Sequence, residues 1–157
     1  MRYKNVRQTH GSVRQRGVAI IEFTIVLPVM LFLILAVAEF GRAFMYYNTL
    51  TRAVRDSARY VSANALKGQS QIVDIDANLI QAAENLVAYG NIAGTGPRVL
   101  SDGTLGTVSI IDQGDGVISV IATYPYTPML GNVLPNFRGG GVAAAFTMQA
   151  QVTMKAI

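Results

Sequence analysis

The stretch that decides the fold is residues 17–47, GVAIIEFTIVLPVMLFLILAVAEFGRAFMYY. Its apolar part, Val18–Ala38, is interrupted only by Glu22, Thr24 and Pro28. At 1.5 Å per residue, a helix of that length spans about 30 Å, which is the thickness of the hydrocarbon core of a bilayer. We therefore expect one transmembrane helix over residues 18–40 and a chain that crosses the membrane once.

The charges ahead of this stretch predict its orientation. The chain has 13 lysines and arginines against 9 acidic residues, and five of the basic residues lie in residues 1–17, which contain no acid. These five are Arg2, Lys4, Arg7, Arg14 and Arg16. Because positive charges stay on the cytoplasmic side, the N-terminus is expected in the cytoplasm and the chain beyond Phe40 outside it. The remaining 8 basic residues form no stripe with interleaved aromatics, so we expect no nucleic-acid partner.

The inventory of reactive side chains excludes most catalytic and metal sites. There is no cysteine, and the single histidine, His10, lies in the basic leader. A thiolate site, a histidine cluster and a Ser-His-Asp triad are therefore excluded. The scattered carboxylates, such as Glu84, Asp112 and Asp115, form no paired-acid motif. We expect no enzyme activity, no cofactor, no metal and no small-molecule substrate.

Three readings of the apolar segment remain open. In the first it is a secretory signal peptide cut at the A-x-A site of residues 36–38, and in the second it is an uncleaved signal anchor. Either of these would leave a secreted or signal-anchored extracytoplasmic binding domain. In the third, the chain is cut between Gly17 and Val18 on the cytoplasmic side, and Glu22 becomes the fifth residue of a chain that keeps its helix.

The third reading gives Glu22 a physical role. Cutting ahead of Val18 removes all five leader charges and frees an amino group at the end of an apolar stem. In a helical filament this amine and the Glu22 carboxylate would neutralise each other or those of a neighbour, because an unpaired charge in an apolar bundle costs several kcal/mol. Pro28 would release the carbonyl of Thr24 from its helical hydrogen bond, so the helix could kink or melt there.

Residues 17–47 closely resemble the N-terminal motif of TadE-like proteins, the minor pilins or pseudopilins of the tight-adherence (Tad/Flp) pilus system. The matching features are Gly17 with Glu22-Phe23 as a processing site, Leu27-Pro28 as the mid-helix proline, and Glu39-Phe40-Gly41-Arg42 as an exit motif. Residues 53–60, AVRDSARY, resemble the amphipathic continuation of that family's helix. Residues 124–128, YPYTP, resemble the loop that many members carry before the last strand.

This resemblance implies a processing event and a set of partners. It implies cleavage after Gly17 by a prepilin peptidase, methylation of the Val18 amine, and a role for Glu22, Phe23 and Pro28 in recognition and assembly. The expected partners are that peptidase, other Tad pilins or pseudopilins and the inner-membrane assembly platform. The implied function is to help assemble or cap an adherence pilus from the bacterial inner membrane, with the C-terminal domain in the periplasm.

Beyond the membrane, residues 41–67 are expected to continue the same helix. Its apolar face is predicted to hold Tyr47, Leu50, Val54, Ala58, Val61 and Ala65, which recur at steps of three and four. The helix is expected to end near Leu66, with Gly68 as a left-handed cap. Arg52, Asp56 and Arg59 are expected to form exposed ion pairs on the opposite side.

Residues 68–157 are expected to form a small domain that makes the whole chain α+β and pilin-like. A second helix is predicted from an Asp74 or Asp76 cap to Gly90. Three antiparallel strands are predicted at Thr107–Ile111, Val117–Thr123 and Ala144–Lys155, with a loop at Tyr124–Gly141. The sheet should pack on the amphipathic half of the long helix.

A five-residue loop, residues 112–116, is predicted to join the first two of these strands. Asp112 and Asp115 raise the question of calcium. Their spacing lacks the alternating oxygen ligands and the distant glutamate of an EF-hand loop, so turn chemistry is favoured.

Overall fold

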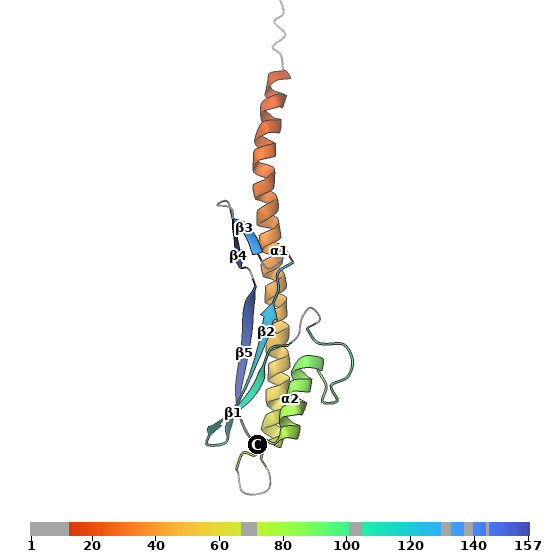
Figure 1. Cartoon of the computed structure of the whole chain (residues 1–157), viewed down its shortest axis with the longest axis vertical. Coiled ribbons are helices and arrows are strands. Elements are labelled where there is room, and N and C mark those ends of the chain that lie inside the picture. Colours follow the sequence, from red (N-terminus) through yellow and green to blue (C-terminus); the bar gives the residue numbers. More distant parts are fainter. Residues whose placement is uncertain (1–12, 67–71, 101–104, 130–132, 137–139, 144) are drawn as a thin grey trace, which may run out of the picture. The chain divides into compact units, whose positions relative to one another are not determined.

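The structure is a computed structural model that describes residues 13–66, 72–100, 105–129, 133–136, 140–143 and 145–157. The elements are α1 (Val13–Asn64), α2 (Ala77–Tyr89), β1 (Val108–Gly114), β2 (Val117–Tyr126), β3 (Val133–Asn136), β4 (Gly140–Ala143) and β5 (Phe146–Lys155) (Figure 1). Contacts divide the chain into two compact units, one ending at Ala38 and the other running from Glu39 to Ile157. One long apolar helix, a second short helix and a small antiparallel sheet confirm the predicted α+β class.

Helix α1 runs without interruption from the apolar segment into the amphipathic one. It continues through Pro28, so the described helix is not melted there. The hydroxyl of Thr24 donates to the carbonyl of Ile20 at 2.8 Å, which keeps this side chain satisfied within the helix. The last helical residue is Asn64, slightly before the expected end at Leu66, and the predicted cap Gly68 lies outside the described residues.

The part of α1 that belongs to the second unit buries one face. The buried positions are Leu50, Ala53, Val54, Ser57, Ala58, Val61 and Ser62, and Ala65 is buried just after the helix ends. Tyr47 was predicted on this face and is 44% exposed, whereas Tyr46 packs against the core. The 3.6-residue period explains the difference, since Tyr46 is one full turn before Leu50 and Tyr47 falls on the flank. Within the described residues, no ion pair joins Arg52, Asp56 and Arg59.

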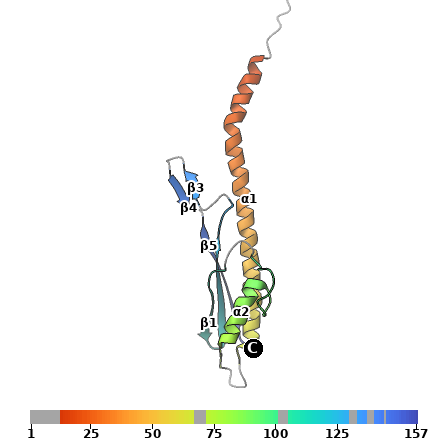
Figure 2. The ribbon, with the colours of Figure 1, turned by 45° about the vertical axis from the view of Figure 1, so that its right-hand side comes forward.

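Strands β1, β2 and β5 form an antiparallel sheet in the order β1-β2-β5. The register places Val120 opposite Val152 and Ala122 opposite Ala150. Strand β5 alternates as predicted, because Met148 and Ala150 are buried while Gln149 and Gln151 are exposed. Figures 1 and 2 both show this sheet and α2 beside the C-terminal part of α1, and the apolar residues of all three form one core.

The hairpin between β1 and β2 is tighter than predicted. Gly114 pairs with Val117, so only Asp115 and Gly116 form the loop, and both have positive φ angles, of 53° and 72°. Positive φ at both loop positions is the type I′ geometry that Asp-Gly favours. The predicted five-residue loop is therefore wrong, because the residues before the turn stay paired around a β-bulge between Asp112 and Gly114.

Helix α2 has both of its ends capped by side-chain or backbone contacts. The carboxylate of Asp76 accepts from the backbone N–H of Leu79 at 2.8 Å, so Asp76, not Asp74, is the N-cap. Gly90 adopts a left-handed conformation at the C-cap, as predicted. The buried hydroxyl of Ser57 donates to the carbonyl of Ala83 at 3.1 Å and ties α2 to α1.

The segment Tyr124–Gly141 was predicted as a loop, and this prediction is wrong at both ends. Strand β2 extends to Tyr126, which pairs with Phe146 of β5. Strands β3 and β4 pair with each other in a second, two-stranded sheet. The misleading residue is Pro125: the register between β1 and β2 ends at Ala122, so β1 needs no backbone N–H from position 125 and a proline is tolerated there.

Candidate functional site

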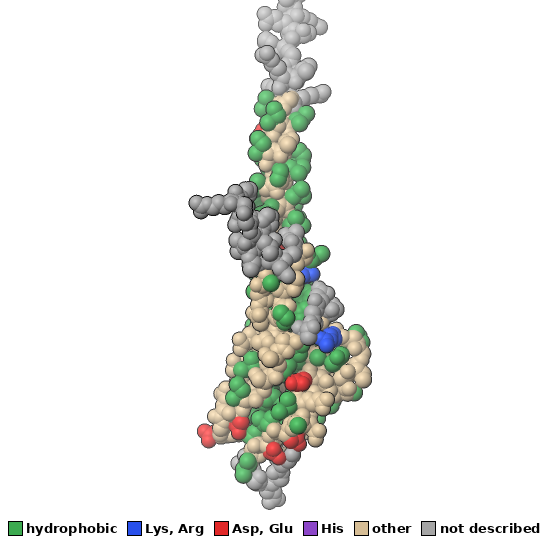
Figure 3. Space-filling model, viewed as in Figure 1, with side chains coloured by type: hydrophobic (Ala, Val, Ile, Leu, Met, Phe, Trp, Pro, Cys, Tyr) green, Lys and Arg blue, Asp and Glu red, His purple; other side chains and the backbone are tan. Residues whose placement is uncertain are grey.

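The predicted processing and assembly residues all lie on the apolar part of α1. Gly17, Val18, Glu22, Phe23 and Pro28 are exposed, and within the described residues no ion pair involves Glu22. The helix is long and apolar enough to cross a membrane (Figure 3). A Cβ built on Gly17 meets no heavy atom within 4 Å. The side chains of this segment are exposed, so we expect them to act by contacting a membrane, an enzyme or another chain.

The predicted exit motif, in contrast, takes part in a built arrangement in the second unit. Glu39, Arg42 and Tyr46 follow each other at i, i+3 and i+7 on α1, and they meet Tyr124 and Tyr126 near the end of β2. We call these five residues the exit cluster. The helical period places Glu39, Arg42 and Tyr46 on one face of α1, and the strand period of two places both tyrosines on one face of β2. These two faces contact each other.

A chain of hydrogen bonds runs through the exit cluster. The Nε–H of Arg42 donates to the phenol oxygen of Tyr126 at 3.1 Å, and the phenol O–H donates to Oε1 of Glu39. Nε of Arg42 lies 3.7 Å from the same carboxylate oxygen, with both side chains about three-quarters buried or more. Hydrogen bonds to charged groups contribute about 1.5–3 kcal/mol each when one partner is buried. The cluster therefore locks the end of β2 onto α1.

The same two charged residues hold the chain that follows β2. The backbone N–H of Met129 donates to both carboxylate oxygens of Glu39, at 3.3 and 3.2 Å. A terminal N–H of Arg42 donates to the carbonyl of Thr127 at 2.6 Å. Glu39 and Arg42 thus act as side-chain caps for backbone groups that lie beyond the end of β2.

Aromatic rings fill the exit cluster around these polar contacts. The ring of Tyr46 stacks on that of Tyr124 at 5.8 Å between centroids and meets Tyr126 edge-on at 5.7 Å. The guanidinium carbon of Arg42 lies 5.5 Å from the ring of Tyr46 and 5.2 Å from that of Tyr126. Such cation–π contacts contribute about 0.5–2 kcal/mol, more when water is excluded.

The surroundings shift the ionisation of two members. Burial raises the pKa of the Tyr126 phenol above its ordinary value, and the hydrogen bond that it donates to Glu39 raises this pKa further. The hydrogen bond to Tyr126 raises the pKa of Arg42, so its guanidinium stays charged. At neutral pH the cluster therefore holds a cation and a neutral phenol beside the Glu39 carboxylate.

The structure divides the predicted exit motif into two pairs. Glu39 and Arg42 lie in the exit cluster, whereas Phe40 is exposed and a Cβ on Gly41 meets no heavy atom within 4 Å. Sequence reasoning missed Tyr46 and misplaced Tyr126 in a loop. The signal for Tyr126 was the alternation Val120, Ala122, Tyr124, Tyr126, which continues the buried face of β2 across Pro125.

We predict that the exit cluster makes stability sensitive to alkaline pH. Because the pKa of Tyr126 is raised in the folded state, its proton leaves the unfolded chain first, so the stabilisation is complete below about pH 10 and is lost as the pH rises through the folded-state pKa. A Tyr126→Phe variant has no such proton. Between about pH 9 and 11 its free energy of unfolding should fall less than that of the unchanged chain. Equal losses in urea titrations of the two proteins would contradict the assignment.

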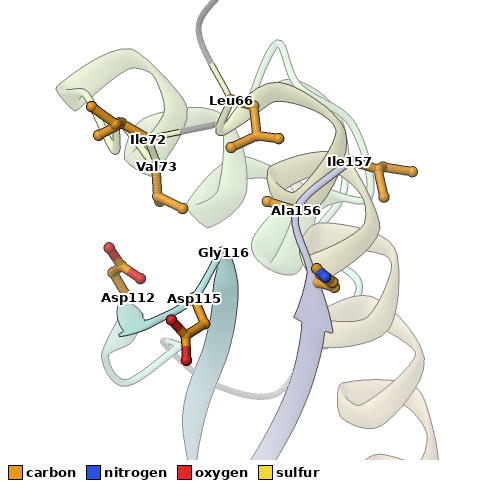
Figure 4. Close-up of a pocket in the computed structure, with 9 residues that line it drawn as sticks. Leu66, Ile72, Val73, Asp112, Asp115, Gly116, Ala156 and Ile157 are labelled. Atoms are coloured by element: carbon orange, nitrogen blue, oxygen red, sulfur yellow. The ribbon is translucent and has the colours of Figure 1, made fainter. Parts of the chain in front are cut away.

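A hollow of about 690 Å³ lies at the hairpin end of the second unit, lined by residues that include Asp112, Asp115 and Lys155 (Figure 4). A carboxylate oxygen of Asp112 accepts from the backbone N–H of Gly114 at 2.9 Å, which is turn chemistry. Within the described residues no group of three or more histidine, cysteine or acidic side chains could hold a metal ion.

The fold and the exit cluster define a class of protein: an α+β domain whose first helix is also an apolar segment that could span a membrane. Comparison with known families then gives a match over residues 17–59 to a family described as TadE-like protein. This match confirms the resemblance found from the sequence, and it includes Glu39 and Arg42 of the exit cluster. No curated protein and no solved structure matches the chain.

Proposed function

We propose that this chain is a minor pilin or pseudopilin that takes part in assembling a Tad pilus for surface adherence. The observation that carries the proposal is the TadE-like match, which begins at Gly17, the residue before the expected cut, and continues to Arg59. The match therefore spans the apolar stem and most of the part of α1 that belongs to the second unit. We propose a structural role in a filament, and no catalysis, for the folded unit.

The continuity of α1 supports this reading over a secreted domain. A signal peptidase cut at residues 36–38 would fall in the middle of a helix, whereas proteolysis favours exposed, non-helical segments. It would also make Glu39, whose carboxylate caps the backbone N–H of Met129, the new N-terminal residue. A cut after Gly17 leaves every described contact of the second unit in place.

The proposal places the chain in the bacterial inner membrane with its N-terminus in the cytoplasm and residues beyond Phe40 in the periplasm. The five basic residues before the helix support this orientation. The proposed partners are the prepilin peptidase, other Tad pilins or pseudopilins, and the inner-membrane assembly platform.

The mass of the membrane form tests the proposal. In cells that contain a prepilin peptidase the protein should begin at Val18, because the cut removes the basic leader and keeps the stem. In cells that lack the peptidase it should begin at Met1. Intact-mass measurement of the protein purified from membranes separates these forms. A chain that begins at Glu39, or that begins at Met1 in both strains, would refute the processing step.

A second prediction concerns the only acid in the apolar stem. The Glu22→Ala chain should be processed as efficiently as the unchanged chain, since alanine is small and position 22 is exposed. Incorporation into pili should fall strongly, because the freed Val18 amine would have no carboxylate to neutralise it in an apolar bundle. Sheared pili and membranes are compared by immunoblot, with Thr24→Ala as the control on the same helix. Normal incorporation of the Glu22→Ala chain would show that Glu22 has no assembly role.

A further inference from the structure

The apolar surface of α1 does not end where the bilayer core would end. Val18–Ala38 already spans about 30 Å as a helix, which fills the hydrocarbon thickness. The next residues nevertheless present large apolar side chains outward. Their exposed fractions are 76% for Phe40, 57% for Phe44, 69% for Met45 and 44% for Tyr47.

These four side chains share the outward side of the helix, away from the core. Phe40, Phe44 and Tyr47 follow the spacing i, i+4, i+7 of one helical face, and Met45 widens it. The other side of the same turns faces the exit cluster through Tyr46. Met129, 76% exposed, adds an apolar side chain at the level of Glu39, which binds its backbone N–H. We call Phe40, Phe44, Met45, Tyr47 and Met129 the collar.

The length of the helix identifies the environment that fits the collar. With Val18–Ala38 filling the hydrocarbon core, Phe40 and Tyr47 lie about 3 and 14 Å beyond its outer edge along the helix, at 1.5 Å per residue. Asn48 and Arg52 follow, and both are exposed polar side chains. The collar therefore occupies the headgroup layer, where aromatic side chains with apolar bodies are enriched.

The charged side chains near the collar are paired with each other and do not face outward. Glu39 and Arg42 are the only ionisable residues with acidic or basic side chains between Val37 and Thr51, and both turn inward to each other and to Tyr126. A charge near a bilayer is much less costly when it is paired. The outward surface is left to the collar, whereas the exposed isoleucines Ile80, Ile92 and Ile111 of the second unit lie apart in sequence, on α2, after α2 and on β1.

We propose that the collar is a lipid-binding surface that seats the stem end of the folded unit in the headgroup layer of the membrane. The inference rests on the membrane placement of α1 and is independent of the pilus role. A neighbouring protein helix is the competing occupant of the same surface.

The chain has no tryptophan, so single tryptophans report local environment without background. Three full-length variants are compared in phosphatidylcholine and phosphatidylglycerol vesicles: Ile25→Trp in the stem, Phe44→Trp in the collar and Ile111→Trp on β1. All three positions are exposed, so the substitutions disturb no core contact. The vesicles carry lipids brominated either near the headgroup or near the end of the acyl chain, because bromine quenches tryptophan only at short range.

The expected result is a depth order. Ile25→Trp is quenched mainly by deep bromine, Phe44→Trp is quenched several times more by shallow than by deep bromine, and Ile111→Trp is quenched by neither. If Ile25→Trp is quenched and Phe44→Trp is quenched by neither lipid, the collar does not bind lipid, although α1 still spans the membrane. If no variant is quenched, the span and the collar both fall. If the Phe44→Trp fluorescence shows burial from water only at a high protein-to-lipid ratio, and bromine does not quench it, a second copy of the chain covers the collar. That result overturns the proposal.

Discussion

Replacing Tyr126 by alanine should lower the free energy of unfolding by about 3–5 kcal/mol, the loss typical of removing a buried aromatic side chain. Tyr126 is buried, and its ring contacts those of Tyr46 and Phe146. The variant also leaves Glu39 and Arg42 without the phenol that joins them. A domain of this size has about 5–15 kcal/mol in total, so much of its stability should disappear. Urea unfolding of the full chain in mild detergent measures the loss.

Two further variants serve as controls: one removes only the hydroxyl of Tyr126, and the other removes a tyrosine outside the core. Tyr126→Phe keeps the ring contacts and should cost only about 1–3 kcal/mol, since only the hydrogen bonds are lost. Tyr47→Ala removes a tyrosine side chain of α1 that lies outside the core, and should change stability by less than about 1 kcal/mol. A Tyr126→Ala loss no larger than that of Tyr47→Ala would mean that the exit cluster does not hold β2 to α1.

Replacing Gly17 by leucine should abolish processing almost completely. A side chain at this position meets no heavy atom within 4 Å, and leucine favours a helix by up to about 1 kcal/mol over glycine. The helix itself should therefore tolerate the change, so a block in cleavage would come from the peptidase, whose site would have to accept four extra carbon atoms beside the bond. The full-length precursor should accumulate in membranes, and intact mass would detect its basic leader.

Gly41 provides the matched control, because it lies in the same helix and a Cβ there also meets no heavy atom within 4 Å. Gly41→Leu should be cut at Val18 as efficiently as the unchanged chain. If both leucine variants are processed normally, Gly17 is not part of a recognition site. If both fail, the cause is a general effect on insertion and not the bond after Gly17.

Much of the fold follows from local periodicity, and its errors have local causes. The apolar stem, the buried face of α1 at Leu50 and Val54, and the alternation of β5 were all readable from spacing. Tyr47 was assigned to the core because a three-residue step to Leu50 looks helical, although the neighbour one full turn away is Tyr46. Tyr124–Gly141 was predicted as a loop because it contains three prolines, although Pro125 lies in β2 beyond Ala122, where the β1–β2 register ends.

The candidate site shows a sharper limit. Glu39 and Arg42 could be singled out from a motif, but their partners Tyr126, Thr127 and Met129 could not. Those contacts join residues more than eighty positions apart, as in the 87 between Glu39 and Tyr126. No periodicity in a single sequence reports such a distance, because it depends on how the strand register aligns β2 with the helix. The predicted processing residues Gly17 and Val18 are the opposite case: they rest on the sequence alone, and both are exposed on α1.

The same separation has a consequence for how the molecule is made. Ribosomes release the N-terminal residues first, at about 5–20 residues per second, so roughly 4–17 s separate the synthesis of Glu39 from that of Tyr126. Throughout that interval the face of α1 that will hold Leu50, Val54 and Val61 has no β2 or β5 to cover it. Until the last strands arrive, the future interior of the domain is the stretch of nascent chain most prone to wrong association.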